Sequence, residues 1–186
     1  MARRKLWNIP NILTVSRVAL IPVLLGVAYL DIPWRHEIVA FLFALAAITD
    51  WFDGWLARRL DQGSAFGRFL DPVADKLMVA ASLILLVEWH PFAYMVIPAI
   101  VITSREITIS ALREWMAELG QRAQVAVSSI GKWKTTAQMV AITGLLWNEP
   151  HLVGLAWVLL YVAVALTLWS MCIYLVAAWP SLREAD

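Results

Sequence analysis

The sequence contains little charge. Of its 186 residues, 16% are charged and 61% are apolar, and the mean hydropathy is +0.70. Soluble globular domains have roughly a quarter of their residues charged and about half apolar, so this composition excludes an ordinary soluble domain. The formal net charge of +1 also argues against the strongly basic face expected of a nucleic-acid-binding protein. Most of the chain is therefore expected to lie in lipid.

Disulfide partners and soft metal ligands are also scarce. Cys172 is the only cysteine, so an internal disulfide is excluded and no zinc or iron–sulfur ligand set is present. The three histidines, His36, His90 and His151, show no metal-ligand spacing. All three lie in the expected turns on one side of the membrane, where they are typical polar turn residues.

Long apolar runs are what the sequence does have. A transmembrane helix needs roughly 20 mostly apolar residues, and six stretches approach this length. They lie at residues 12–30, 37–58, 69–88, 92–113, 133–148 and 152–178. We therefore predict an all-α integral membrane protein with about six transmembrane helices, forming a single domain over residues 1–186.

The positive charges predict the orientation of these helices. Cytoplasmic segments collect Lys and Arg, and in the six-span prediction all of the 15 basic residues except Arg35 fall on the side of the two termini. Both termini are therefore expected in the cytoplasm.

Four aspartates interrupt the second and third apolar runs near their cytoplasmic ends. A charge deep in a membrane costs about 3 kcal/mol on insertion scales, so such a group predicts a functional site. At about 100° per residue, Asp50 and Asp53 share one helical face, and Asp71 and Asp75 share another if that stretch is helical. A short connection makes the two helices antiparallel neighbours, so the four carboxylates are expected in one pocket.

Carboxylates this close together repel one another, and bound cations remove the repulsion. An all-oxygen ligand set favours Mg²⁺ or Mn²⁺ over zinc. Two such ions roughly 4 Å apart stabilise both the attacking and the leaving oxygens in phosphate chemistry. The same faces carry small residues, which leave room for a bulky group against the backbone: Gly54, Ala57, Ser64 and Gly67. Arg58 lies one residue off the face of Asp50 and Asp53 and can bind phosphate.

Two structural alternatives remain open at this level. The acids can instead pair with neighbouring basic residues, Arg58, Arg59, Arg68 and Lys76, in a loop outside the membrane. Pro72 also leaves the start of the third helix undecided. A start before Gly67 places this proline in the helix interior, whereas a start at Asp71 places it in the first turn.

The spacing of these residues matches a known pattern, Asp-x2-Asp-Gly-x2-Ala-Arg-x8-Gly-x3-Asp-x3-Asp. Residues 50–75 satisfy it at all eight fixed positions, and the chain thereby resembles the CDP-alcohol phosphotransferases. The segments 8–17, 69–76, 105–115 and 131–138 are similar to those of bacterial members that act on sn-glycerol 3-phosphate.

The resemblance implies a six-helix fold, usually homodimeric, surrounded by the lipids of a bacterial inner membrane. The implied reaction transfers a phosphatidyl group from CDP-diacylglycerol to sn-glycerol 3-phosphate and releases CMP. Asp50, Asp53, Asp71 and Asp75 would hold two divalent cations, Mg²⁺ or Mn²⁺, and Asp75 would also act as general base. The CDP pocket would be lined by Gly54, Ala57, Arg58 and Gly67. We add Ser64, which lies outside the family pattern.

The acceptor brings its own phosphate, so its site should contain several cations near the metals. The candidates are Arg105, Arg113, Lys132 and Lys134; their alternative role is to anchor the protein to anionic headgroups. Asn11 and Arg17 are further candidates for the pocket.

The sequence leaves two alternative functions open. A sister enzyme would use inositol phosphate, serine or phosphatidylglycerol as acceptor. An ion or proton transporter would also place carboxylates in the membrane, but in repeated halves and near its midplane.

Overall fold

The protein is all-helical in the residues that the computed structural model describes, 9–60, 65–120 and 129–184. The side chains of residues 9, 10, 51, 53–60, 65, 68, 129–132, 181, 182 and 184 lie outside the described set. The helices are α1 (Ile9–Ala28), α2 (Arg35–Leu60), α3 (Ala65–Trp89), α4 (Ala93–Glu118), α5 (Ser129–Trp147) and α6 (Val153–Glu184). The predicted all-α membrane fold is confirmed.

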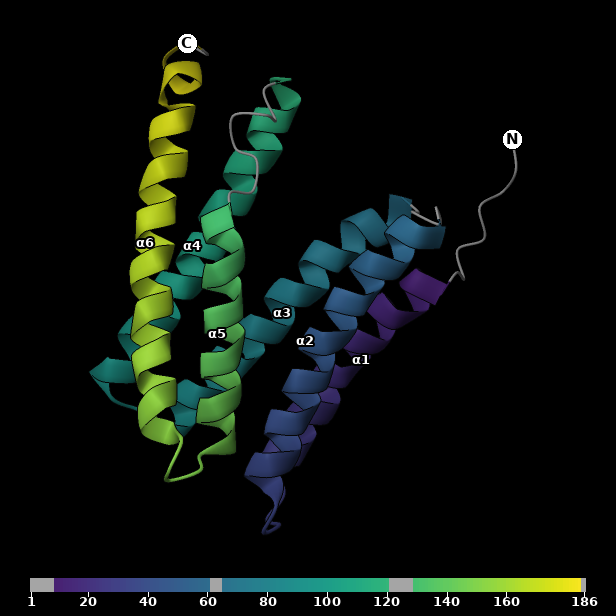
Figure 1. Ribbon diagram of the computed structural model, residues 1–186, viewed down its shortest axis with the longest axis vertical. Helices are drawn as coiled ribbons and strands as arrows, with labels where there is room; N and C mark the ends of the chain where they lie inside the picture. The colour runs from purple at the N-terminus through teal and green to yellow at the C-terminus, as the bar shows by residue number, and fades with distance from the viewer. Residues whose placement is uncertain (1–8, 61–64, 121–128, 185–186) are drawn as a thin grey trace.

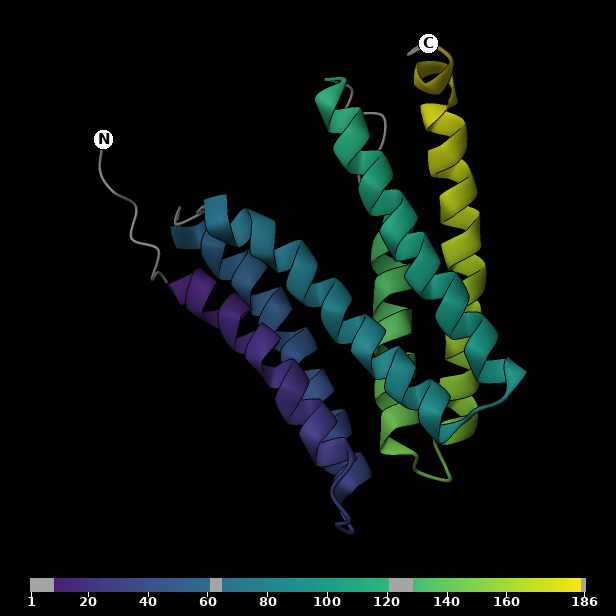
Figure 2. The same ribbon diagram turned by 180° about the vertical axis from the view of Figure 1, so that it is seen from behind.

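The helices form two groups. α1 contacts α2 and α3, while α6 contacts α4 and α5; α2 and α3 join the groups through α5 and α4. Figure 1 shows the groups side by side, and the reverse view in Figure 2 shows the same arrangement. α1 begins, α2 ends and α3 begins at one end of the bundle, where α4 ends, α5 begins and α6 ends. We call it the site end.

Length and composition support membrane insertion. The shortest helix, α5, has 19 residues and is about 28 Å long, close to the thickness of the hydrocarbon core. Three segments of the described chain are long and apolar enough to cross a membrane: Asn11–Ala28, Ala93–Glu118 and Val153–Pro180. The number of six membrane crossings therefore stays a prediction.

Helix boundaries differ from those predicted by four or more residues in four places, one of which is the start of α5 at Ser129 instead of residue 133. α3 starts at Ala65, four residues before the predicted start, so Pro72 lies in its interior and the carbonyl four residues earlier lacks its helical partner. α4 continues to Glu118 and ends where Gly120 adopts a φ of +73°, a conformation that glycine adopts without strain. α6 runs six residues beyond the predicted end, since its C-terminal turns remain helical to Glu184.

Polar and apolar burial separate along the bundle. The main apolar core joins buried residues of α1 to α6, among them Leu24, Phe43, Leu86, Ile102 and Leu145. Nearer the site end, buried side chains include Asn11, Arg17, Arg105 and Lys134. A hydrophobic core thus holds the helices together and leaves buried polar groups at the end that the sequence predicts to be functional.

Gly144 sets the separation of α5 and α6. A Cβ added to Gly144 would lie 2.8 Å from the Cβ of Ala156 on α6, much closer than two carbon atoms can approach. The absence of a side chain at Gly144 therefore allows the two helices to touch.

The variant Gly144→Ala should lower the free energy of unfolding by about 1 to 3 kcal/mol through overpacking. Ala156→Gly in the same chain should restore most of the loss, because it removes the clashing methyl group. Gly154→Ala is the matched control, since an added Cβ there meets nothing within 4 Å. Thermal unfolding in detergent measures the effect, and equal melting temperatures for Gly144→Ala and Gly154→Ala would contradict it.

Candidate functional site

α1 contacts two of the four predicted acidic residues. Arg17 is 1% exposed, and its Nη1 donates to Oδ1 of Asp50 on α2 at 2.6 Å. One turn earlier on α1, the Thr14 hydroxyl donates to Oδ1 of Asp71 on α3. Because both donors lie on one face of α1, this helix holds acids from two different helices.

Asp75 completes the described part of this acidic group. It lies one helical turn after Asp71 on α3 and interacts electrostatically with Asp50, Arg17 and Glu106. Gly67 is buried two turns before Asp75 on the same helix. The structure therefore brings Asp50, Asp71 and Asp75 to neighbouring helices.

Other residues predicted for the acidic site are described only in part. Asp53, Gly54, Ala57 and Arg58 lie on α2, but only their backbone is described. Ser64 lies outside the described residues. Asn11 is buried on α1, three residues before Thr14.

The ligand chemistry fits divalent cations. The described acids offer only hard oxygen donors, and the like charges of Asp75 and Asp50 act on each other, a repulsion that a cation would relieve. Among the described residues, whose side chains do not include that of Asp53, no group of three or more His, Cys, Asp or Glu is arranged to hold a metal ion. Thr14 and Arg17 instead engage Asp71 and Asp50.

A polar cavity of about 560 Å³ opens between α3, α4, α5 and α6. Asp75 lies in its wall together with three of the predicted acceptor-binding cations, Arg105, Arg113 and Lys134. Lys132, the fourth, lies on α5, but its side chain is outside the described set. The base predicted from the sequence and the predicted phosphate-binding cations thus share one cavity.

Glu106 links two of these cations. Its Oε1 accepts a hydrogen bond from Lys134 Nζ at 2.7 Å and from Arg105 Nη1 at 2.8 Å. Lys134 and Arg105 are 2% and 7% exposed, so neither charge is well solvated. One carboxylate therefore compensates two buried cations from different helices.

Sequence reasoning missed Thr14 of α1, Glu106 of α4 and two residues of α6. Ser170 Oγ accepts a hydrogen bond from Arg105 Nη2 at 3.1 Å, and the Tyr174 hydroxyl lies 3.5 Å from Arg113 Nη2. The position of Glu106 next to Arg105 was an available signal, because a carboxylate within a membrane helix needs a partner. Ser170 and Tyr174 stand in an apolar run, where no spacing identifies them.

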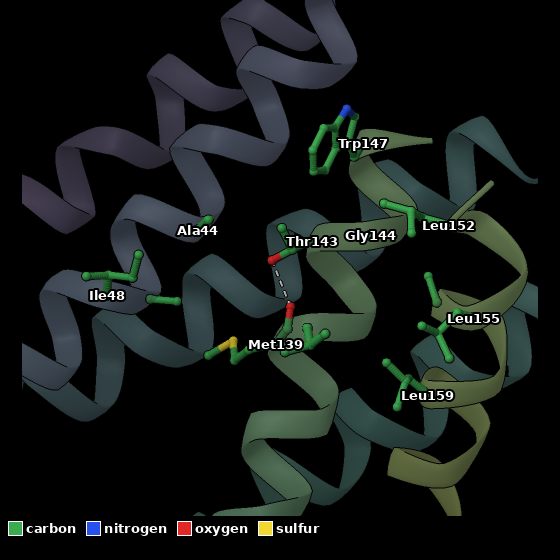
Figure 3. Close-up of a pocket in the computed structure, with 12 residues that line it drawn as sticks. Ala44, Ile48, Met139, Thr143, Gly144, Trp147, Leu152, Leu155 and Leu159 are labelled. Carbon is green, nitrogen blue, oxygen red and sulfur yellow. Dashed lines mark hydrogen bonds between the residues drawn. The ribbon is translucent and has the colours of Figure 1, made fainter. Parts of the chain in front are cut away.

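A second cavity, of about 430 Å³, lies between α2, α5 and α6 and is almost entirely apolar. In Figure 3, Ala44 and Ile48 of α2 face Met139 and Thr143 of α5, with Leu155 and Leu159 of α6 on the other side. The Thr143 hydroxyl donates to the Met139 carbonyl within α5, which removes its polarity from the cavity. Met139 also borders a small polar cavity lined by Asp75, so the apolar space lies next to the acidic site.

Comparisons with known proteins define the class. The family model for CDP-alcohol phosphatidyltransferases matches residues 7–169, and the chain belongs to this family. Similar curated relatives come from Yersinia enterocolitica (54% identical, covering 95% of this chain and 98% of the relative) and Salmonella choleraesuis (56%, covering 96% and 98%). A third, from Pectobacterium atrosepticum, is 53% identical and covers 96% of this chain and 98% of its own. All three are named CDP-diacylglycerol--glycerol-3-phosphate 3-phosphatidyltransferase.

The variant Glu106→Gln should destabilise the protein, because it leaves Lys134 and Arg105 buried without a counter-charge. We expect a loss of about 2 to 3 kcal/mol, measured as a lower melting temperature in detergent. Glu118→Gln on the exposed end of α4 is the control and should change little. An unchanged melting temperature for Glu106→Gln would show that the ion pairs contribute no net stability.

Proposed function

We propose that this protein transfers the phosphatidyl group of CDP-diacylglycerol to sn-glycerol 3-phosphate and releases CMP. One observation carries the proposal: Asp75 shares a cavity with Arg105, Arg113 and Lys134. An acceptor whose phosphate binds these cations would present its hydroxyl near a carboxylate. The names of the curated relatives give the same reaction. Family membership favours phosphatidyl transfer over ion transport.

Each group of site residues would have its own role in the reaction. Asp75 would take the proton of the incoming hydroxyl as its oxygen forms a bond to the β-phosphorus and the bond to CMP breaks. Arg58, Gly54, Ala57, Ser64 and Gly67 would hold the CDP moiety. Asp50, Asp53, Asp71 and Asp75 would hold two Mg²⁺ or Mn²⁺ ions, which, when bound, neutralise the charge of the pyrophosphate. A single displacement of this kind inverts the configuration at phosphorus.

The membrane setting suits a lipid substrate. CDP-diacylglycerol has two acyl chains that need apolar surroundings and a nucleotide that needs polar ones. The apolar cavity between α2, α5 and α6 lies next to the acidic group, so an acyl chain would have a place to lie. We further propose a homodimer in the bacterial inner membrane, with the site end and both termini facing the cytoplasm, where both substrates are accessible.

The defining experiment measures CMP release by the purified protein with CDP-diacylglycerol and a panel of alcohols. We expect turnover with sn-glycerol 3-phosphate and little with inositol phosphate, serine or phosphatidylglycerol. Preference for one of these other acceptors would leave the family chemistry intact but reject the proposed substrate. Turnover with none of them would reject phosphatidyl transfer.

The variant Asp75→Asn should abolish turnover while much of the binding of CDP-diacylglycerol survives, because the amide cannot accept the proton of the hydroxyl. General-base loss costs roughly 10²- to 10⁴-fold in rate. Asp31→Asn, in the connection between α1 and α2 at the other end of the bundle, is the control and should retain activity. Near-normal turnover by Asp75→Asn would remove the base assignment.

Removal of divalent cations with a chelator should stop CMP release, and addition of Mg²⁺ or Mn²⁺ should restore it. The reason is that the acidic residues repel both one another and the pyrophosphate unless cations are bound. Full activity in excess chelator would contradict the proposed role of the four aspartates.

A further inference from the structure

Two polar side chains of α6 are buried against α4. Ser170 is 2% exposed and Tyr174 4% exposed, in a helix that is otherwise largely apolar. They lie four residues apart, on one face of α6. Ser170 accepts a hydrogen bond from Arg105, and Tyr174 lies beside both Arg105 and Arg113.

The Tyr174 ring is placed near two positive charges. The guanidinium carbon of Arg113 lies 5.3 Å from the ring centroid, and that of Arg105 lies 6.0 Å from it. An aromatic face attracts a guanidinium group at these distances. One neutral ring therefore holds two like charges on the same wall of the cavity without neutralising either.

Both guanidinium groups keep unused hydrogen-bond donors. The buried Nε atoms of Arg105 and Arg113 have no hydrogen-bond partner among the described residues. The aromatic contact uses none of the hydrogen-bond donors of the two guanidinium groups, whereas a second carboxylate in place of Tyr174 would compete with an incoming anion. A phosphate dianion is the ligand that such a fork of donors recognises.

Net charge alone does not direct a phosphate to this wall. The cavity is lined by four basic side chains, Lys76, Arg105, Arg113 and Lys134, and by the three acids Asp75, Glu106 and Glu114. With charges so nearly balanced, the position of the two guanidinium groups decides where an anion binds.

We infer that Tyr174, assisted by Ser170, is a positioning residue that orients Arg105 and Arg113 toward the phosphate of the acceptor. The inference rests on the proposed function for the identity of that acceptor. Through these two residues, α6 would favour acceptors that carry a phosphate monoester.

Direct binding tests the inference without turnover. sn-Glycerol 3-phosphate is titrated into purified full-length protein in detergent, with chelator present, by isothermal titration calorimetry. Tyr174→Leu removes the ring and should weaken binding about 2- to 30-fold. Tyr174→Phe keeps the ring and should bind within about twofold of the unmodified protein, because the hydroxyl contact at 3.5 Å is long.

Kinetics separate positioning from a structural role. Tyr174→Leu should raise the KM for sn-glycerol 3-phosphate by a similar factor and leave the KM for CDP-diacylglycerol unchanged. Tyr161→Leu, on the same helix near Tyr94, is the matched control and should alter neither constant. Equal rises in both KM values, or equal losses for the Phe and Leu variants, would overturn the inference.

A double-mutant cycle covers the case in which Tyr174→Leu folds poorly. Arg105→Lys and Arg113→Lys each keep the charge but lose the planar group, so Ser170→Ala is combined with each of them and the affinity for sn-glycerol 3-phosphate is measured. Coupling of Ser170→Ala to Arg105→Lys, and not to Arg113→Lys, supports the assigned contacts; purely additive effects oppose them. Binding without CMP release would reject the proposed function alone, whereas no binding by the unmodified protein would reject this inference.

Discussion

A charge buried in a membrane protein has to be compensated within the protein, and this constraint organises the site end of the bundle. Arg17 and Asp50 pair across α1 and α2, and Glu106 joins Arg105 to Lys134 across α4 and α5. Lipid offers no counter-charge, so the charged side chains pair with one another. Some pairs join two helices, and the pair of Arg105 with Glu106 lies within α4. The polar groups that we propose to bind substrates therefore also hold the site end together.

This dual role explains why the apolar core and the polar site are separated along the helices. Apolar contacts through Phe43, Leu86 and Ile142 hold together the part of the bundle away from the site end, and these contacts need no polar partners. The site end is then free to carry charges, and ion pairs and hydrogen bonds between helices set their arrangement. A protein that packed apolar residues evenly to both ends would have no charged cavity at the site end.

Much of this arrangement is readable from the sequence. Apolar runs predicted all six helices, because a membrane requires length and hydropathy that few other structures need. The spacing of Asp50, Asp71 and Asp75 predicted neighbouring acids, since helical periodicity fixes which residues share a face. Helix ends were less predictable. Pro72 is compatible with either a first turn or an interior position, and only the start of α3 at Ala65 decides between them.

The contributions of Thr14, Ser170 and Tyr174 were not predictable, since each depends on which helices meet. α1 reaches acids on two other helices, and α6 reaches arginines on α4, through contacts between residues 57 to 65 positions apart. A hydroxyl in an apolar run looks the same whether it faces lipid or a guanidinium group. Only the packing of the helices tells these cases apart.

The close approach of Gly144 to Ala156 has a mechanical consequence. With no room for even a methyl group between them, α5 and α6 cannot slide along each other by a helical turn without a collision. The two helices therefore form a rigid unit, which keeps Lys134, Ser170 and Tyr174 at constant positions relative to one another. If a two-tailed lipid enters the bundle, other helices have to separate to admit it. The apolar cavity beside α2 lies where the helices are already apart.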